Sequence, residues 1–211
     1  MEKNKLDSSN PFSFFDKIYC ISMSNKSLNW MQAEKQLKIL GIYDRTQRIQ
    51  AIKEEKYWEG CRKSHQLCIR DAKKSGAKSI LILEDDFVFM SRDMKLLGSA
   101  LNNLKKYDWE LFYLGAIIEE KLKDLEDNLC SAKVWATHAY AINHKVFDKI
   151  LTFKGDERIL PNGCPAGHID VFYYENDFKT YLINPIMVLQ MTPKKKQRMH
   201  VQVRSFWKEM I

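Results

Sequence analysis

The sequence predicts an α/β fold in which helices cover both faces of a mostly parallel central sheet. Short β-branched and aromatic runs alternate along the chain with longer segments whose apolar residues recur at helical spacing, which is typical of such a sheet. The clearest strand, residues 79–83, is the continuously apolar run Ser-Ile-Leu-Ile-Leu, as expected for a strand buried on both faces. The chain has 211 residues, of which 45% are hydrophobic. That is enough for one domain with a substantial core.

The first elements follow from local patterns. Residues 1–15 form a polar lead-in, and residues 16–23 form the first predicted strand because they are rich in β-branched and aromatic side chains. Apolar residues then recur at helical intervals up to Gly41, a residue type that commonly ends helices. Residues 43–52 are predicted to form a second strand with a loop. Residues 59–74 have the amphipathic pattern of a helix, which leads into the strand described above.

The elements after this strand are assigned in the same way. In chain order they are a helix at 93–106, a strand at 109–114, a charged irregular loop at 116–131, a strand at 134–142, a helix at 145–153, a loop at 155–167, a short helix at 168–176 and a late strand at 181–189 interrupted by Pro185. These elements predict a single domain over residues 16–191, followed by a basic tail at 192–211.

Charge and composition narrow the classes of function. Lys and Arg number 34 against 27 Asp and Glu, giving a net charge of +7. This excess favours a polyanionic partner, such as a nucleotide diphosphate, a nucleic acid or an acidic membrane. No helix-turn-helix, RNP or zinc-finger pattern is present, so a nucleic-acid partner is not expected. Neither a signal-peptide pattern nor a long apolar span is visible, so we expect a cytoplasmic protein.

An acidic turn, Glu84-Asp85-Asp86, follows the buried strand directly. Ligands of open α/β sheets bind beyond the carboxyl ends of the strands, so this turn lies where chemistry is expected. Three adjacent carboxylates repel one another, and a divalent cation would relieve that repulsion. Hard oxygen ligands suit Mn²⁺ or Mg²⁺, which would neutralise a diphosphate leaving group. The alternative is a solvated acidic turn, but its position between two apolar runs favours a site.

Several motifs share the order found in a known enzyme family. They are Ile18-Tyr19-Cys20-Ile21-Ser22, Gly60-Cys61-Arg62-Lys63-Ser64-His65, Leu83-Glu84-Asp85-Asp86, Phe112-Tyr113-Leu114-Gly115 and Thr137-His138-Ala139-Tyr140-Ala141-Ile142. This order resembles glycosyltransferase family 25, which includes bacterial lipooligosaccharide galactosyltransferases and collagen galactosyltransferases. The match spans roughly residues 16–190. The chain departs from it after the first strand, where Ser22-Met23-Ser24-Asn25-Lys26 replaces an Asn-Leu-x-x-Arg pattern.

The resemblance implies a GT-A fold, in which the acidic turn stands in for the Asp-x-Asp metal motif. Asp86 would then be the direct ligand of Mn²⁺ or Mg²⁺. Residues at the ends of the first strands, on the preceding helix and in the acidic turn would bind the nucleotide and donor sugar. These candidate donor-binding residues are Ile21, Ser22, Arg48, Ser64, His65, Glu84 and Asp85.

A second metal hypothesis concerns one helical face. Cys61, His65 and Cys68 are spaced i, i+4, i+7, so they lie on the same side of the predicted helix. They could be three zinc ligands, but a structural zinc site has four, and no second Cys/His pair follows at the usual spacing. Buried cysteines on an apolar face are therefore favoured, with His65 facing the site as a hydrogen-bonding group.

A catalytic base is needed for direct displacement by an acceptor hydroxyl. Asp170 follows a Gly/Pro-rich loop and begins an aromatic-rich helix, which makes it the leading candidate. The alternative role for Asp170 is a charge that interacts with the helix dipole. Glu175 and Asp177 are weaker candidates for the base, and His168 is a candidate metal or phosphate ligand.

The basic tail offers two interpretations. Its residues 194–198 could fold over a diphosphate, with His200 completing the metal site. The tail could equally be solvated, or Phe206 and Trp207 could dock it on the domain or on an acidic lipid surface.

The leading functional hypothesis is a metal-dependent hexosyltransferase. It would move a hexose from a nucleotide diphosphate sugar to a hydroxyl of a glycan or glycoprotein acceptor. The resemblance implies a UDP-linked donor and inversion at the anomeric carbon. The alternatives are a nucleotidyltransferase or phosphatase that uses the same acids, a non-catalytic glycosyltransferase-like binding module, and a basic nucleic-acid-binding domain.

Overall fold

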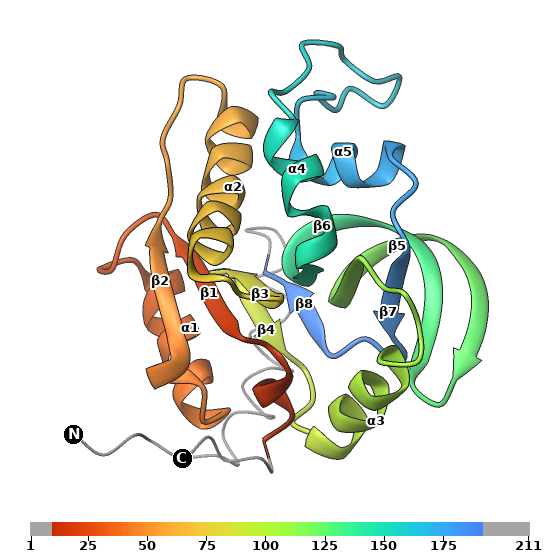
Figure 1. The fold of residues 1–211 in the computed structure, drawn as a ribbon. Helices are drawn as coiled ribbons and strands as arrows, with labels where there is room; N and C mark the ends of the chain where they lie inside the picture. The colour runs from red at the N-terminus through yellow and green to blue at the C-terminus, as the bar shows by residue number, and fades with distance from the viewer. Residues whose placement is uncertain (1–9, 192–211) are drawn as a thin grey trace.

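The computed structural model describes residues 10–191 (Figure 1). The strands are β1 (Lys17–Ser22), β2 (Thr46–Gln50), β3 (Ser79–Glu84), β4 (Phe87–Phe89), β5 (Leu111–Glu126), β6 (Leu129–Asn143), β7 (Thr180–Ile183) and β8 (Val188–Gln190). The α-helices are α1 (Leu28–Ile39), α2 (Tyr57–Ser75), α3 (Met94–Leu104), α4 (Phe147–Thr152) and α5 (Ile169–Glu175), and the short 3-10 helices are η1 (Pro11–Phe14), η2 (Tyr43–Arg45) and η3 (His144–Val146). Within these described residues, no helix is long and apolar enough to cross a membrane.

The central sheet has the strand order β2-β1-β3-β6-β5-β7 among the described residues. β1 is parallel to both β2 and β3, and β5 is parallel to β7. β6 is antiparallel to β3, β5 and β7, so in the described sheet only β6 runs against the common direction. The predicted mostly parallel α/β sheet is thereby confirmed.

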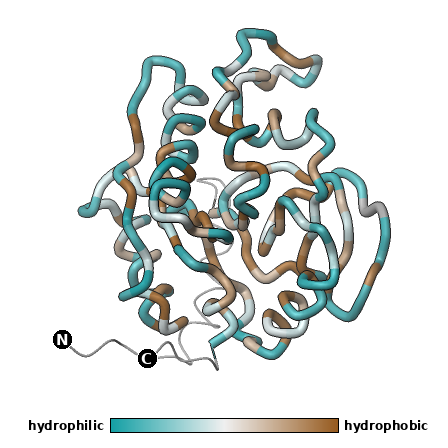
Figure 2. Tube along the Cα trace, in the orientation of Figure 1, coloured by the Kyte–Doolittle hydropathy of each residue, from teal (hydrophilic) through white to brown (hydrophobic). Residues whose placement is uncertain are grey.

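Helices cover both faces because side chains alternate along each strand. On one face, Ile18 of β1 and Leu81 of β3 pack with apolar residues of α1 and α3. On the other, Tyr19 and Ile80 pack with residues of α2, α4 and α5. Figure 2 shows that the outer loops are mainly hydrophilic, while hydrophobic stretches run through the interior of the domain. The acidic turn therefore emerges from between two apolar layers.

Two predictions of local structure are wrong. The predicted loop at 116–131 is instead a long hairpin of β5 and β6, closed by a turn at Asp127 and Asn128. Asn128 has a φ of 65°, and asparagine tolerates this left-handed conformation better than most residues. The charged residues that suggested a loop belong to a part of the hairpin with several exposed positions.

The predicted late strand at 181–189 is also wrong, because it is two strands in different sheets. β7 pairs with β5 and β6 in the central sheet, whereas β8 pairs antiparallel with β4 in a small second sheet. The chain changes sheets through residues 184–187, which include Pro185. This change brings β8 next to the acidic turn, because β4 begins immediately after Asp86.

Gly115 allows β8 to approach β5 closely. A Cβ atom at this position would lie 1.9 Å from the carbonyl oxygen of Val188 and 2.9 Å from Nε2 of His138. The distance to the Val188 oxygen is much shorter than a van der Waals contact, and this oxygen belongs to the backbone of β8. A side chain at Gly115 would therefore push β8 away. Gly115 is therefore needed for steric reasons.

We predict that Gly115→Ala lowers the free energy of unfolding by about 3 kcal/mol, because overpacking displaces backbone as well as side chains. Gly98 in α3 is the control, since a Cβ there would meet only Pro11 Cβ at an ordinary 3.9 Å. Gly98→Ala should raise the free energy of unfolding by about 0.5–1 kcal/mol through helix propensity. Urea denaturation followed by circular dichroism measures both changes, and equal stability of the two variants would contradict the steric argument.

Candidate functional site

A cavity of about 430 Å³ opens at the carboxyl ends of β1 and β3, beside the start of α2. Its lining combines the acidic turn, residues of α2 and the segment that follows β2. The lining residues are Ile21, Met23, Ala51, Ile52, Lys53, Glu54, Tyr57, Cys61, Ser64, His65, Glu84, Asp85 and Asp86. Most of the predicted donor-binding residues therefore line one cavity. This cavity lies at the carboxyl ends of the strands, where open α/β sheets bind their ligands.

Glu84 ends β3 and is held on the α2 side of the sheet. Its Oε1 atom accepts a hydrogen bond of 2.8 Å from Thr137 Oγ1 and lies 3.3 Å from His65 Nε2. The other ring nitrogen of His65 is 3.0 Å from the hydroxyl of Tyr140. Burial opposes the ionisation of Glu84, but the contacts with His65 and Thr137 outweigh it and lower the pKa of Glu84 below its usual value. Glu84 is thus fixed as a carboxylate.

Asp85 points to the opposite side and ties the acidic turn to the end of β1. It accepts a 2.7 Å hydrogen bond from Ser22 Oγ, and its backbone N–H donates to the Ile21 carbonyl at 2.9 Å. Ser27 and Asn29 lie within longer hydrogen-bond reach of the carboxylate, each at 3.5 Å. Asp85 therefore orders the loop between β1 and α1.

Asp86 faces β8. Its Oδ2 atom accepts a 3.1 Å hydrogen bond from Gln190 Nε2, while its Oδ1 atom is buried without a hydrogen-bond partner among residues 10–191. Burial and the negative charge of Glu84 raise the pKa of Asp86 to about 7, against the opposing hydrogen bond from Gln190. An unpartnered buried carboxylate oxygen beside other acids is the environment that a bound cation would stabilise.

Thr137 and His138 on β6 belong to the site although the sequence analysis assigned them no role there. Ala136, just before them, has a φ of 78°, a conformation that costs free energy for a residue with a Cβ atom. His138 is 2% exposed, and among the described residues neither of its ring nitrogens makes a well-formed hydrogen bond. Burial lowers the pKa of His138, partly offset by the charge of Glu84 and by the Val188 carbonyl. The motif containing this pair was visible in the sequence, but its contact with Glu84 was not.

The remaining predicted donor-binding residues differ in their exposure to the cavity. Ile21 lines it directly, whereas Ser22 contributes through its bond to Asp85. The hydroxyl of Ser64 donates to the Gly60 carbonyl at 2.7 Å and accepts from the Ile52 N–H at 2.8 Å, so it fixes the segment that forms the cavity wall. Arg48 lies outside the lining, where its guanidinium donates to Gln50 and sits 5.4 Å from the Trp30 ring.

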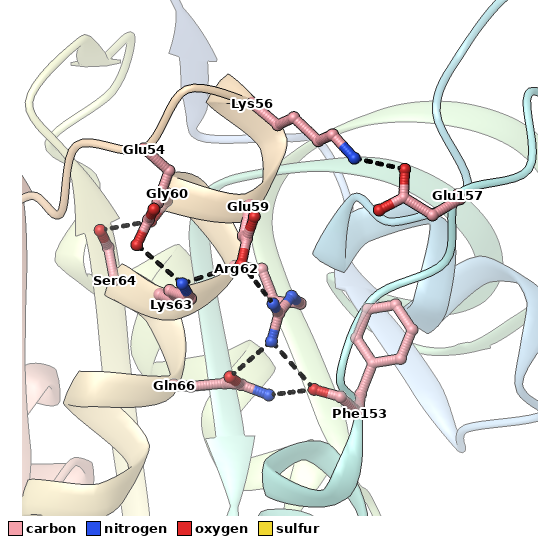
Figure 3. Close-up of polar contacts among 10 residues, drawn as sticks. All are labelled: Glu54, Lys56, Glu59, Gly60, Arg62, Lys63, Ser64, Gln66, Phe153 and Glu157. Atoms are coloured by element: carbon pink, nitrogen blue, oxygen red, sulfur yellow. Dashed lines mark hydrogen bonds and ion pairs between the residues drawn. The ribbon is translucent and has the colours of Figure 1, made fainter.

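A polar network anchors the start of α2 to the segment that follows α4 (Figure 3). Arg62 donates to Gln66 Oε1 and to the Phe153 carbonyl, each at 3.2 Å, and Gln66 donates to the same carbonyl at 2.7 Å. Lys56 pairs with Glu157 at 2.5 Å across the same junction. These contacts position the segment that leads to Asp170.

Asp170 lies in the first turn of α5 with a side chain that is 25% exposed. Its Oδ1 atom accepts a 2.9 Å hydrogen bond from the Val171 N–H and lies 3.9 Å from His168 Nδ1. Burial lowers the pKa of His168, while the charges of Asp170 and Glu84 oppose that shift. Glu175 pairs instead with Arg158 at 3.2 Å, and Asp177 is exposed. The predicted ligand His200 lies outside the described residues.

The cysteine face of α2 agrees with the favoured buried cysteine at Cys68 but not at Cys61, which is only partly buried. Cys68 is buried, with its thiol directed at the Ser64 carbonyl at 3.5 Å, as expected for a core cysteine. Cys61 instead faces the cavity, where its sulfur, a ring nitrogen of His65 and a carboxylate oxygen of Glu84 lie within 4.8 Å of one another. The third member of this cluster is thus Glu84, not Cys68.

Solved structures of low sequence identity share this fold. A glycosyltransferase involved in the glycosylation of the major capsid of PBCV-1 aligns with a TM-score of 0.56 and 10% identity, covering 89% of this chain and 99% of that chain. Apo-UDP-glucose pyrophosphorylase aligns with a TM-score of 0.52 and 9% identity, covering 92% and 82%. A197 from STIV aligns with a TM-score of 0.51 and 12% identity, covering 84% and 86%.

These likenesses support the predicted GT-A-like fold, and at such low identity they concern the fold alone. No protein-family model matches the chain. No curated protein matches it in sequence either. Membership of glycosyltransferase family 25 therefore stays a prediction from the sequence motifs.

The strained residue next to the site gives a stability prediction. Ala136→Gly should raise the free energy of unfolding by about 1 kcal/mol, because glycine adopts a positive φ without the cost that a Cβ atom brings. Ala132 on the same strand is the control, since it is buried and its φ is not positive. Ala132→Gly should instead lower stability. Chemical denaturation measures both changes, and destabilisation by Ala136→Gly would contradict the assigned strain.

Proposed function

We propose that this protein is a metal-dependent glycosyltransferase that uses a nucleotide diphosphate sugar. The observation that carries the proposal is the acidic turn at the end of β3. Its three carboxylates diverge into different surroundings beside a cavity of about 430 Å³, and one buried oxygen of Asp86 has no partner among the described residues. A volume of this size suits a small-molecule ligand.

Asp86 is the residue that would hold the metal ion. Its carboxylate offers the hard oxygen that Mn²⁺ and Mg²⁺ prefer, and its Oδ1 atom is free of hydrogen bonds from residues 10–191. When bound, the ion supplies charge that stabilises the departing diphosphate. His200 of the basic tail remains the proposed additional ligand.

The nucleotide would lie between the end of β1 and the acidic turn. Asp85 and Ser22, joined at 2.7 Å, order this edge, and Ile21 offers apolar surface to a base or ribose. Glu84, held by His65 and Thr137, would accept hydrogen bonds from donor-sugar hydroxyls. UDP is the proposed nucleotide, in keeping with the family resemblance, and Arg48 would contribute from outside the cavity by its positive charge.

Asp170 is the proposed catalytic base. In an inverting transfer, the acceptor hydroxyl oxygen bonds to the anomeric carbon while the bond from that carbon to the diphosphate oxygen breaks. The hydroxyl proton moves to a carboxylate oxygen of Asp170. The proposed acceptor is a hydroxyl of a glycan or glycoprotein.

Nucleotidyl transfer is the second candidate, because UDP-glucose pyrophosphorylase shares the fold. A Gly-rich phosphate loop would be expected to serve that reaction. The segment after β1, residues 23–27, reads Met-Ser-Asn-Lys-Ser and contains no glycine. Sugar transfer is therefore favoured.

We predict that UDP or a UDP-sugar raises the melting temperature by several degrees only when Mn²⁺ is present. Ligand at about 100 times its Kd stabilises by about 2.7 kcal/mol, and a chain of this size shifts by about 2–4 °C per kcal/mol. Asp86→Asn should abolish the metal-dependent shift, whereas Asp177→Asn, a change at an exposed carboxylate, should retain it. The absence of a shift with every nucleotide tested, at millimolar concentration, would sink the proposal.

The catalytic role of Asp170 is tested separately from donor binding. Asp170→Asn should lower kcat for sugar transfer about 10²–10⁴-fold, because the base is lost. The metal-dependent thermal shift should persist, since the amide side chain of this variant keeps an oxygen for the Val171 N–H. Glu175→Gln is the matched control and should leave kcat near the wild-type value. A greater loss of kcat in Glu175→Gln than in Asp170→Asn would indicate that Glu175, not Asp170, is the base.

A further inference from the structure

A second group of possible metal ligands lines the same cavity and does not include Asp86. Cys61 and His65 are one turn apart on α2, and Glu84 approaches them from the end of β3. The sulfur, a ring nitrogen and a carboxylate oxygen lie within 4.8 Å of one another, with His65 Nε2 and Glu84 Oε1 only 3.3 Å apart. These separations require only small adjustments to place three donors around one ion at bond lengths of about 2.0–2.3 Å.

Hydrogen-bond partners fix the orientation of two of the three side chains, His65 and Glu84. Tyr140 Oη contacts Nδ1 of His65, so Nε2 is directed at Glu84 and the cavity. Thr137 Oγ1 donates to Glu84 Oε1, the same oxygen that lies 3.3 Å from His65 Nε2. Histidine and carboxylate ligands in metal sites are commonly fixed by such outer hydrogen bonds. The arrangement therefore has supporting contacts beyond the ligand atoms themselves.

The negative charges around Cys61 also favour a bound cation. Burial raises the pKa of the Cys61 thiol, and the negative charges of Glu84, Asp170 and Asp86 raise it further. The same charges that disfavour an isolated thiolate attract a divalent ion, and coordination to that ion stabilises the thiolate. A mixed sulfur, nitrogen and oxygen set suits zinc and other thiophilic ions better than Mn²⁺ or Mg²⁺.

We propose that Cys61, His65 and Glu84 form a binding site for Zn²⁺ or a similar thiophilic ion, with its fourth position open to the cavity. Three protein ligands and one open position differ from the closed four-ligand arrangement of structural zinc sites. The ion would occupy Glu84 and exclude the donor sugar, making the site inhibitory. That consequence rests on the proposed glycosyltransferase function, whereas metal binding does not.

Cobalt substitution tests the site directly. Titration of the full chain with Co²⁺ should produce a thiolate-to-cobalt charge-transfer band together with the visible bands of a tetrahedral ion. Cys61→Ser should abolish the charge-transfer band. Cys164→Ser is the matched control, because Cys164 is also partly buried but lies outside the cavity lining, and it should retain the band. Displacement by Zn²⁺ in competition with a chromophoric chelator then gives the affinity.

Glu84→Gln provides a second variant that keeps the thiol and nearly the same shape. It should weaken Zn²⁺ binding by about 100-fold. Loss of a residue that only hydrogen-bonds to a metal ligand typically lowers metal affinity by about 10–100-fold, and loss of a direct ligand should reach at least the upper end of that range. Wild-type protein without a charge-transfer band, or a band that survives in Cys61→Ser, would overturn the proposal. Unchanged Zn²⁺ affinity in Glu84→Gln would also overturn it.

The two metal hypotheses can fail independently. Cys61→Ser should keep the Mn²⁺-dependent thermal shift with UDP, and Asp86→Asn should keep the cobalt charge-transfer band. If the thermal shift is absent while the band is present, the proposed function fails and the thiophilic site stands. If the thermal shift is present while the band is absent, only the thiophilic site fails.

Discussion

The site depends on the pairing of β3 between β1 and β6. β3 runs parallel to β1 and antiparallel to β6, so its end is fixed from both sides. Parallel pairing places the ends of β1 and β3 at the same edge, where the Asp85 N–H continues the ladder to Ile21. Antiparallel pairing with β6 brings Thr137 beside Glu84. The sheet therefore determines where each carboxylate of the acidic turn is placed.

The three acids of the turn differ in the hydrogen-bond partners that compensate for the burial of their carboxylates. Glu84 has a histidine and a hydroxyl, and Asp85 has a serine hydroxyl. Asp86 has the amide of Gln190 on Oδ2 but no hydrogen-bond partner on Oδ1 among the described residues. A buried carboxylate without enough partners favours its neutral form, which is why the pKa of Asp86 rises to about 7 whereas that of Glu84 falls. This inequality makes Asp86 the position where an added cation gains most.

The fold and the place of the candidate site could be predicted from the sequence because both depend on local patterns. The continuous apolar run of β3 and the acids that follow it are adjacent in the chain, and the helical period of α2 places His65 toward the sheet. The partners of those acids could not be read, since Thr137 lies 53 residues from Glu84 and Gln190 lies 104 residues from Asp86. The β5–β6 hairpin was missed because the exposed part of a hairpin has the composition of a loop.

Glu84 connects the two proposed uses of the cavity. With the proton of His65 on Nε2, the ring donates to Glu84 and keeps the carboxylate available to sugar hydroxyls. With the proton on Nδ1, the ring donates to Tyr140, and the bare Nε2 can join Glu84 and Cys61 around a thiophilic ion. The two proposed occupants of Glu84 would therefore require different tautomers of His65. The proposed inhibition therefore requires the His65 proton to lie on Nδ1 and the Cys61 thiol to release its proton to solvent as the ion binds. Its strength depends on the affinity of this site for zinc relative to its affinity for the donor sugar.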